Sequence, residues 1–296
     1  MKNNRKIFAL GFFDGVHLGH QALLDACVKL AQAHSATPAT ITFQQHPQSL
    51  FSAQIPALIN ANPDRDTLLT RYGMEYIHRL EVNEEIMSTN WRDFLENLRA
   101  EGAIGFVCGD DFRFGHKGQG DTQKLVDFCR AYALPCVIVP EQTKDGIRIS
   151  STHIRNLIEQ GDMETAAQFL GHPHILSGEV VSGRQIGRTI GIPTANILIP
   201  EGVVTPKLGV YACICRIDDA THLSVTNIGS RPTVEGHQIR AESWILDFDG
   251  DLYGKRITLE FYNFLRPERK FDSLEELRQE ILENAQQTQT LLMGRY

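Results

Sequence analysis

The chain has 296 residues, which at roughly 150 residues per domain favours two modest domains or one large one. Hydrophobic residues make up 42% of it and charged residues 22%, so collagen-like and strongly disordered classes are excluded. The 29 lysines and arginines against 36 aspartates and glutamates give a net charge of −7, the wrong sign for a protein that mainly neutralises nucleic acid. We therefore expect any phosphate that it binds to belong to a small molecule.

The N-terminal segment and the cysteines indicate where the protein works. No apolar run approaches the ~20 residues of a membrane helix, and the first apolar run ends at Asp14, so we expect neither a signal peptide nor a membrane partner. The six cysteines form no C-x-x-C pair and lie mostly in apolar segments that resemble core. A reduced, cytoplasmic protein is the expectation.

The first half alternates continuous apolar runs with helical periodicity, the pattern of a parallel sheet with crossover helices. Strands are predicted at residues 7–12, 39–43, 104–108 and 136–139. Helical stripes of apolar residues cover residues 23–31, 91–98 and 125–132. Two short helices ending in glycine are predicted next, at residues 150–161 and 162–171.

The character changes after His172-Pro173, where helical structure is expected to end. Short β-rich segments follow at residues 175–181, 194–199, 210–217, 223–228, 243–248 and 257–264. About six strands in that space suggest a small antiparallel barrel. A capping box at Ser273 and Glu276 predicts a terminal helix. We expect two different domains, 1–172 and 173–296.

The segment GFFDGVHLGH, residues 11–20, lies between the first expected strand and the first expected helix. Free backbone N–H groups and the positive end of the helix dipole favour an anion there. His17 and His20 would point the same way on a first helical turn, and Gly19 would let a ligand approach the backbone. A glycine-rich turn with two surface histidines is the alternative. The strand-to-helix position favours a site that stabilises charge in phosphoryl or nucleotidyl transfer.

Two further segments of the first half can hold a ligand. Consecutive hydroxyls open the helix expected after residue 150, flanked by Arg148 and Arg155, which suits phosphate; a plain serine N-cap is the alternative. The segment GDDFRFG, residues 109–115, follows a strand end, where open α/β sheets bind ligands. Taken alone, it could equally be a solvated loop.

A glycine- and arginine-rich segment precedes the sequence IPTAN in the second half. Gly183 and Gly187 allow the backbone to approach a polyphosphate closely, and Arg188 supplies charge. Thr194 and Asn196 face the same way in an extended strand and can offer a hydroxyl and an amide oxygen to Mg²⁺. A β-hairpin with glycine-rich turns and incidental arginines is the alternative.

Together these segments resemble the bacterial bifunctional riboflavin kinase/FAD synthetases. That family carries G-x-F-D-G-V-H-x-G-H, G-x-D/N-F-x-F-G and I-S-S-T-x-I-R elements in this order, which residues 11–20, 109–115 and 149–155 match. Residues 178–196 match the start of its riboflavin kinase domain almost position by position. Further matches occur at residues 209–211, 227–233, 242–248, 251–254 and 265–271. The resemblance thus spans nearly the whole chain.

The resemblance implies a fold and two reactions. The fold is a Rossmann-like, nucleotidyltransferase-type α/β domain followed by a six-stranded antiparallel riboflavin kinase barrel with a terminal helix. The reactions are phosphorylation of riboflavin by ATP to FMN, and adenylylation of FMN by a second ATP to FAD and pyrophosphate. Mg²⁺ is the implied cofactor, and riboflavin, FMN and ATP are the implied substrates.

The resemblance also implies roles for residues of the adenylyltransferase domain. His17 and His20 would be catalytic, binding and polarising the ATP phosphates. The other implied ATP- and phosphate-binding residues are Gly11, Phe12, Asp14, Gly15, Gly19, Arg148, Ser151, Thr152 and Arg155. The implied flavin- and nucleotide-binding residues are His46, Asp111 and Phe112.

In the kinase domain, the resemblance makes Glu242 the general base that takes the proton from the ribityl 5′-hydroxyl. The implied ATP-binding residues are Gly183, Gly187, Arg188, Thr194 and Asn196, of which Thr194 and Asn196 would also bind the metal. Arg266 and Glu268 are the implied flavin-binding residues.

Three positions depart from the family pattern: Gln45 replaces the usual proline before His46-Pro47, Trp244 the usual histidine, and Asn284 a frequent aspartate. Trp244 motivates an alternative, an FAD synthetase whose kinase half has weakened. A flavin-binding regulator without turnover is a second alternative, against which the joint presence of the transfer residues argues. A cytidylyltransferase-like enzyme is compatible with the first half, but the kinase half excludes it.

Overall fold

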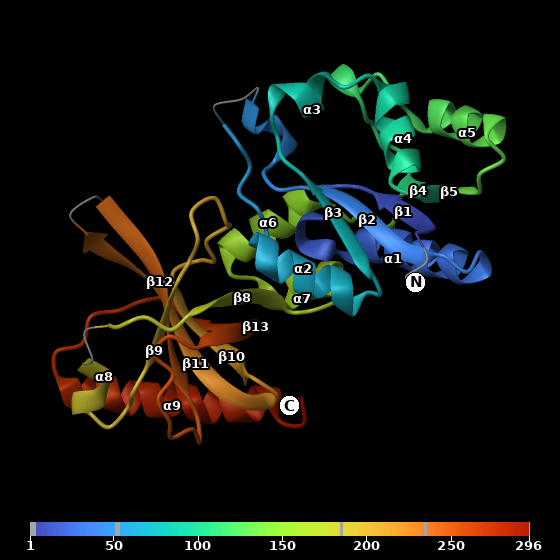
Figure 1. The fold of residues 1–296 in the computed structure, drawn as a ribbon. Coiled ribbons are helices and arrows are strands. Elements are labelled where there is room, and N and C mark those ends of the chain that lie inside the picture. The colour runs from blue at the N-terminus through green and yellow to red at the C-terminus, as the bar shows by residue number, and fades with distance from the viewer. Residues whose placement is uncertain (1–3, 51–53, 184–185, 234–235, 296) are drawn as a thin grey trace. The chain divides into compact units, whose positions relative to one another are not determined.

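The computed structural model describes residues 4–50, 54–183, 186–233 and 236–295 (Figure 1). Contacts between residues divide the chain into two compact units. Unit 1 comprises Met1–Leu58 and Arg65–Ser151, and unit 2 comprises Ile59–Asp64 and Thr152–Tyr296. The boundary between the two units, as their contacts define it, therefore lies after Ser151 and not at residue 172. The reason is that α6 (Ser151–Gln160) and α7 (Met163–Leu170) pack with the second half, α7 on two of its strands.

Unit 1 is built on a parallel sheet in the order β3-β2-β1-β4-β5. Its strands are β1 (Lys6–Leu10), β2 (Thr37–Phe43), β3 (Tyr76–Leu80), β4 (Ala103–Gly109) and β5 (Cys136–Val139). Its helices are α1 (Leu18–Ala33), α2 (Asn62–Arg71), which begins in unit 2, α3 (Glu84–Ser88), α4 (Trp91–Ala100) and α5 (Thr122–Ala131). Three 3-10 turns, η1 (Asp14–Val16), η2 (Pro47–Leu50) and η3 (His116–Gly118), and a small hairpin, β6 (Thr143–Lys144) with β7 (Ile147–Arg148), complete it.

The central strands β1 and β4 are buried because their sequences are continuous apolar runs. Phe8 and Phe106 from these strands belong to one core cluster with Leu95 of α4 and Phe128 of α5. The strand order changes direction between β1 and β4, so the chain leaves these neighbouring strands toward opposite sides. In open α/β sheets, ligands bind in the crevice that this leaves at the carboxyl ends of the strands.

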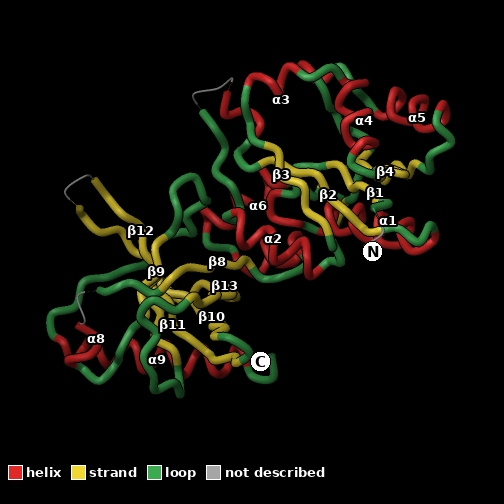
Figure 2. The backbone as a smooth tube through the Cα atoms, viewed as in Figure 1, coloured by secondary structure: helices red, strands yellow, loops and turns green. Residues whose placement is uncertain are grey.

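Unit 2 is built on an antiparallel sheet in the order β8-β13-β10-β11-β12-β9 (Figure 2). Its strands are β8 (His174–Glu179), β9 (Ala195–Leu198), β10 (Gly209–Ile217), β11 (Ala220–Thr233), β12 (Gly236–Ile245) and β13 (Arg256–Arg266). A bridge between Val181 and Asn196 joins the two edges of the sheet, so it is close to a closed barrel. The helices after α7 are α8 (Ile186–Thr189) and α9 (Leu274–Leu292).

Helix α9 covers strands β10 and β11. Ala285 and Leu292 on its apolar face share a core cluster with Val210 and Leu223 from those strands. Ser273 caps the helix, as its Oγ accepts a hydrogen bond from the backbone N–H of Glu276 at 3.1 Å. The terminal helix and its Ser273 N-cap are therefore confirmed. The Glu276 side chain accepts from the backbone N–H of Asp272 at 3.1 Å rather than from that of Ser273, so the second half of the predicted capping box is shifted by one residue.

The structure confirms the expected α/β first half and the six-stranded antiparallel second half. The sequence patterns do not predict α2, α3 or β3. Strand β3 lies at an edge of the sheet, and its sequence, YIHRL, is only half-buried, so it has no continuous apolar run. The last strands also differ in extent, since β12 begins at Gly236 rather than at residue 243 and forms a long hairpin with β11.

All six cysteines lie in described parts of the chain and are free thiols. Cys136 is half-buried and the others are buried. Burial raises the pKa of the Cys27 thiol to about 11 and those of Cys108 and Cys215 to about 12. Among the described residues, no helix combines the length and the apolar character that crossing a membrane requires.

Candidate active sites

The chain leaves β1 through a tight turn that precedes α1. The backbone has positive φ at Phe13 (57°), Gly15 (79°) and Val16 (41°). Glycine adopts this conformation readily, whereas at the other two positions it costs on the order of 1–3 kcal/mol each. Both Phe13 and Val16 are buried, and this burial offsets the backbone cost. The turn brings His17 and His20 to the start of α1.

His17 is the N-cap of α1. Its Nδ1 accepts a hydrogen bond from the backbone N–H of His20 at 3.3 Å, and the two imidazole rings stack with centroids 3.6 Å apart. Burial lowers the pKa of His20 well below 6.5, and the charges of His17 and Arg65 lower it further. His20 is therefore a neutral imidazole at pH 7. The pair lies where the positive end of the helix dipole favours an anion.

A cavity of about 250 Å³ opens at this point, at the carboxyl ends of β1 and β4. The sequence-predicted residues that line it are Gly11, Phe12, His17, Gly19, His20, Asp111, Phe112, Arg148 and Ser151. Asp14 and Gly15 are buried beside it, and the Ser151 hydroxyl donates to the Asp14 carbonyl at 3.0 Å. Segments far apart in the sequence thus meet at one cavity, which we name the histidine cavity.

Charged groups of both signs line the histidine cavity. Arg148 Nη2 lies 2.6 Å from Asp111 Oδ2, and Arg148 Nε lies 2.8 Å from Glu141 Oε2. These pairs are solvent-exposed, so they are weak and can exchange partners with a bound phosphate. Thr152 and Arg155 belong to unit 2 by their contacts, and there Arg155 Nη2 donates to Thr152 Oγ1 at 3.1 Å. Thr152 and Arg155 are therefore not among the residues that line the histidine cavity.

A second cavity of unit 1, of about 360 Å³, is mainly apolar, and we name it the aromatic cavity. It shares Gly11, Phe12, Asp111 and Phe112 with the histidine cavity. The apolar lining residues that lie outside every predicted site segment are Ile41, Phe43, Leu80, Ile86, Met87 and Phe94, whereas Phe114 belongs to the predicted segment 109–115. His46 packs against the edge of the Phe12 ring, with centroids 5.1 Å apart. The only signal for Ile86 and Met87 was that they are apolar residues in an otherwise polar segment. Helix α3 is only five residues long, which is too short for a helical periodicity to be recognised.

In unit 2, a cavity of about 280 Å³ brings together the predicted kinase residues, and we name it the glutamate cavity. The predicted residues that line it are Gly187, Thr194, Asn196, Glu242, Arg266 and Glu268. Glu242 on β12 stands opposite Asn196 on β9 and Asn227 on β11. Side chains opposite one another in antiparallel strands share a face, so these groups converge. A neighbouring cavity of about 590 Å³ shares Thr194.

Glycine is required at positions 183 and 187, where the backbone at and before α8 lies against the segment that leads into β9. A Cβ atom on Gly183 would lie 2.7 Å from Asn196 Nδ2, and one on Gly187 would lie 2.1 Å from the Ile192 carbonyl. The backbone N–H of Ile192 donates to the Gly187 carbonyl at 2.7 Å. The side chain of Arg188 lies outside the described part of the structure. The two glycines therefore allow the backbone to lie directly against Thr194 and Asn196.

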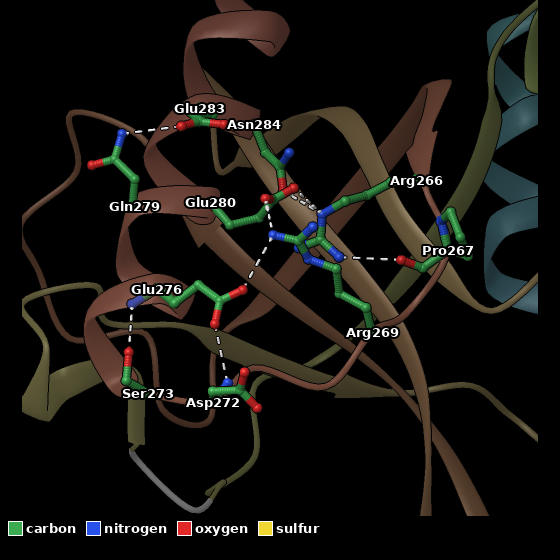
Figure 3. Close-up of polar contacts among 10 residues, drawn as sticks. All are labelled: Arg266, Pro267, Arg269, Asp272, Ser273, Glu276, Gln279, Glu280, Glu283 and Asn284. Carbon is green, nitrogen blue, oxygen red and sulfur yellow. Dashed lines mark hydrogen bonds and ion pairs between the residues drawn. The ribbon is translucent and has the colours of Figure 1, made fainter.

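Arg266 is fixed at the glutamate cavity by helix α9, as Figure 3 shows. Its Nε donates to Asn284 Oδ1 at 3.0 Å and lies 2.8 Å from Glu280 Oε1, while the Oε2 atom of Glu280 pairs with Arg269. Glu268 accepts a hydrogen bond from Asn227 Nδ2 at 3.2 Å. Asn284 is buried and lines the cavity. Glu280 was missed by sequence reasoning because it belongs to no matched motif.

Trp244, one of the departures from the family pattern, also lines the glutamate cavity. It follows Glu242 by two residues on β12, so both side chains lie on the same face of the strand. Its ring packs against the apolar cluster beneath α9. The tryptophan therefore forms a flat apolar wall beside the glutamate.

Comparisons with known proteins match both halves of the chain. The FAD synthetase family model matches residues 1–153, and the riboflavin kinase model matches residues 170–292. The bifunctional riboflavin kinase/FMN adenylyltransferase of Listeria monocytogenes is 36% identical over 287 residues, which cover 96% of this chain and 91% of that protein. The Escherichia coli protein of the same description is 33% identical over 279 residues, covering 93% and 89%.

A crystal structure from Streptococcus pneumoniae, described as that of a macrolide-efflux protein, has a TM-score of 0.86 and 29% sequence identity to this chain. The match covers 98% of this chain and 97% of the Streptococcus pneumoniae chain. The family models match in the same order as the two units, and the relatives exceed 30% identity over almost the full length. The chain belongs to the bifunctional riboflavin kinase/FMN adenylyltransferase family.

Proposed function

We propose that the two activities of the family are divided between the two units. Riboflavin kinase activity, which produces FMN, belongs to unit 2, and FMN adenylyltransferase activity, which produces FAD, belongs to unit 1. The observation that carries this division is that each unit has its own cavity lined by its own transfer residues, the histidine cavity in unit 1 and the glutamate cavity in unit 2.

In unit 2, the Glu242 carboxylate takes the proton of the ribityl 5′-hydroxyl as that oxygen attacks the γ-phosphorus of ATP. The bond from the γ-phosphorus to the β-bridging oxygen breaks, so FMN and ADP result. Gly183 and Gly187 keep the backbone close to the polyphosphate. Arg266 and Glu268, which line the same cavity, hold the flavin.

The residues of unit 2 fit a magnesium ion. The Oδ1 atom of Asn196 is buried and accepts no hydrogen bond from any described residue. Thr194 lines the same cavity, and amide and hydroxyl oxygens are hard ligands of the kind that Mg²⁺ takes beside phosphate oxygens. Thr194 and Asn196 would hold the ion, which when bound supplies positive charge to the phosphates.

In unit 1, a phosphate oxygen of FMN attacks the α-phosphorus of ATP, and pyrophosphate leaves. His17, His20 and the backbone at the start of α1 stabilise the charge on the phosphates, with Arg148 and Ser151 beside them. The aromatic cavity accepts the flavin ring, which stacks on aromatic side chains. His46, Thr152 and Arg155 keep the binding roles that the family motif gives them.

The free thiols support action in a reducing compartment, the cytoplasm. A second candidate is an FAD synthetase with a weakened kinase half. It is favoured by one observation, that Trp244 lines the glutamate cavity beside Glu242.

A chromatographic time course with ATP and Mg²⁺, started from riboflavin and in parallel from FMN, tests the proposal. The wild type should make FMN and then FAD. Glu242→Gln should lower FMN formation by about 100-fold or more and leave FAD formation from FMN intact, and His20→Ala should do the reverse. Unchanged FMN formation in Glu242→Gln would remove the proposed base, and FAD from FMN alone in the wild type would establish the weakened kinase.

A further inference from the structure

Arg65 on α2 belongs to none of the matched motifs, yet its side chain is 0% exposed. Arginine is almost never fully buried unless it is paired, because removing its charge from water is unfavourable. The cost must be offset by specific contacts. The contacts identify what the residue does.

The guanidinium joins the ends of two neighbouring strands. Its Nη1 donates to the Phe12 carbonyl at 3.2 Å, just beyond β1, and its Nη2 donates to the Phe43 carbonyl at 2.5 Å, at the end of β2. The guanidinium carbon also lies 5.0 Å from the centroid of the Phe12 ring, a cation–π distance. The planar fork of an arginine is the side chain that reaches two carbonyls at once.

The charge of Arg65 is kept. Burial lowers the pKa of Arg65 to about 10, while the negative charge of Asp14 raises it, so the guanidinium is protonated at neutral pH. Asp14 belongs to the turn that follows Phe12 and precedes the histidines. A fixed positive charge therefore lies beneath the turn that is proposed to bind the ATP phosphates.

The two residues that Arg65 holds both line the aromatic cavity. Phe12 lines both the histidine cavity and the aromatic cavity, and Phe43 lines the aromatic cavity. Phe12 is thus part of the wall between the nucleotide and the flavin. A shift of about 1 Å in such a wall can cost about 100-fold in rate, because it misaligns the reacting groups.

We infer that Arg65 is a positioning residue for FAD formation, which acts through Phe12 and Phe43 to fix the wall between the two cavities of unit 1. The inference rests on the adenylyltransferase function proposed for that unit. In this role Arg65, a buried charged residue outside the matched motifs, helps to align FMN with ATP.

Arg65→Lys separates the fork from the charge, since lysine keeps the charge but presents a single nitrogen. We expect the KM for FMN to rise about tenfold and the KM for ATP to stay within about twofold of the wild type. Arg65→Met removes both features and should lower kcat/KM for FAD formation by about 100-fold or more. The riboflavin kinase activity of the same molecules, measured in parallel, should stay within about twofold and reports the folding of unit 2, while the unchanged KM for ATP in Arg65→Lys reports the folding of unit 1.

Arg79→Lys is the matched control. Arg79, on β3 of unit 1, is partly buried, and it pairs with Asp66 rather than with either phenylalanine carbonyl. Its replacement should leave the KM for FMN unchanged. An unchanged KM for FMN in Arg65→Lys, or an equal loss of both activities in Arg65→Met, would overturn the inference. A wild type that makes no FAD from FMN would instead contradict the proposed function.

Discussion

His174 links the stability of the protein to pH. It is buried at the start of β8, where its ring packs against Phe261 with centroids 5.7 Å apart. Burial lowers the pKa of His174 to about 3, and the charge of His172 contributes. Between pH 6.5 and about 3, the unfolded chain therefore binds a proton that the folded chain does not. The contribution of this residue to stability is complete above pH 6.5 and is lost as the pH falls.

His174→Phe should remove this dependence while keeping the ring contact. Between pH 7.5 and 5.5, the free energy of unfolding of the wild type should fall by about 1.4 kcal/mol more than that of the variant, because one unfolded histidine takes up a proton. Urea denaturation at both pH values measures the two losses. Equal losses would show that His174 is not the group responsible.

Helix α9 supports the wall of the glutamate cavity at Arg266, because it carries the residues that hold this arginine. Ser273→Ala removes the cap of this helix and should lower the free energy of unfolding by about 1 kcal/mol. Urea denaturation followed by circular dichroism measures the loss. Thr290→Ala is the control on the same helix: Thr290 is exposed and bonds only within the helix, to the Gln286 carbonyl, so its replacement should cost nothing. Equal effects of the two variants would contradict the capping role.

The elements that could be predicted from the sequence are those whose buried residues are apolar. Strands β1 and β4 are continuous apolar runs, and α9 has both a cap and a stripe. Helix α2 is different, because its buried residues include charges. Asp64 accepts a hydrogen bond from the backbone N–H of Ser177, and Arg65 donates to two carbonyls, so tertiary contacts that no periodicity reveals stabilise both.

The same distinction applies to the sites. The histidine and glutamate cavities could be predicted because their polar residues lie in motifs with fixed spacing. The aromatic cavity could be predicted only in part, at Phe12, Asp111 and Phe112. The rest of its wall comes from segments far apart in the sequence, whose apolar residues, such as Leu80 and Phe94, also look like ordinary core. The charge that supports it, Arg65, lies on a helix of low hydropathy.

At the scale of the whole molecule, the proposed division predicts that the two reactions can be separated and recombined. Glu242→Gln and His20→Ala proteins, each given riboflavin, ATP and Mg²⁺, should make no FAD alone, but their mixture should make it. The reason is that FMN released by one molecule is the substrate of the other. Chromatography of the mixture measures this. No FAD from the mixture, when Glu242→Gln still converts added FMN, would show that FMN passes only within one molecule.

The distribution of buried cysteines gives each unit its own chemical reporter of opening. Cys27 and Cys108 lie in unit 1, and Cys213 and Cys215 lie in unit 2. Folded, these thiols are shielded, and their raised pKa values leave little reactive thiolate. An alkylating reagent therefore reaches them only when the surrounding structure opens, and mass spectrometry of the labelled peptides would show which unit opens first and how often. The native cysteines can therefore report the unfolding of each unit without any added label.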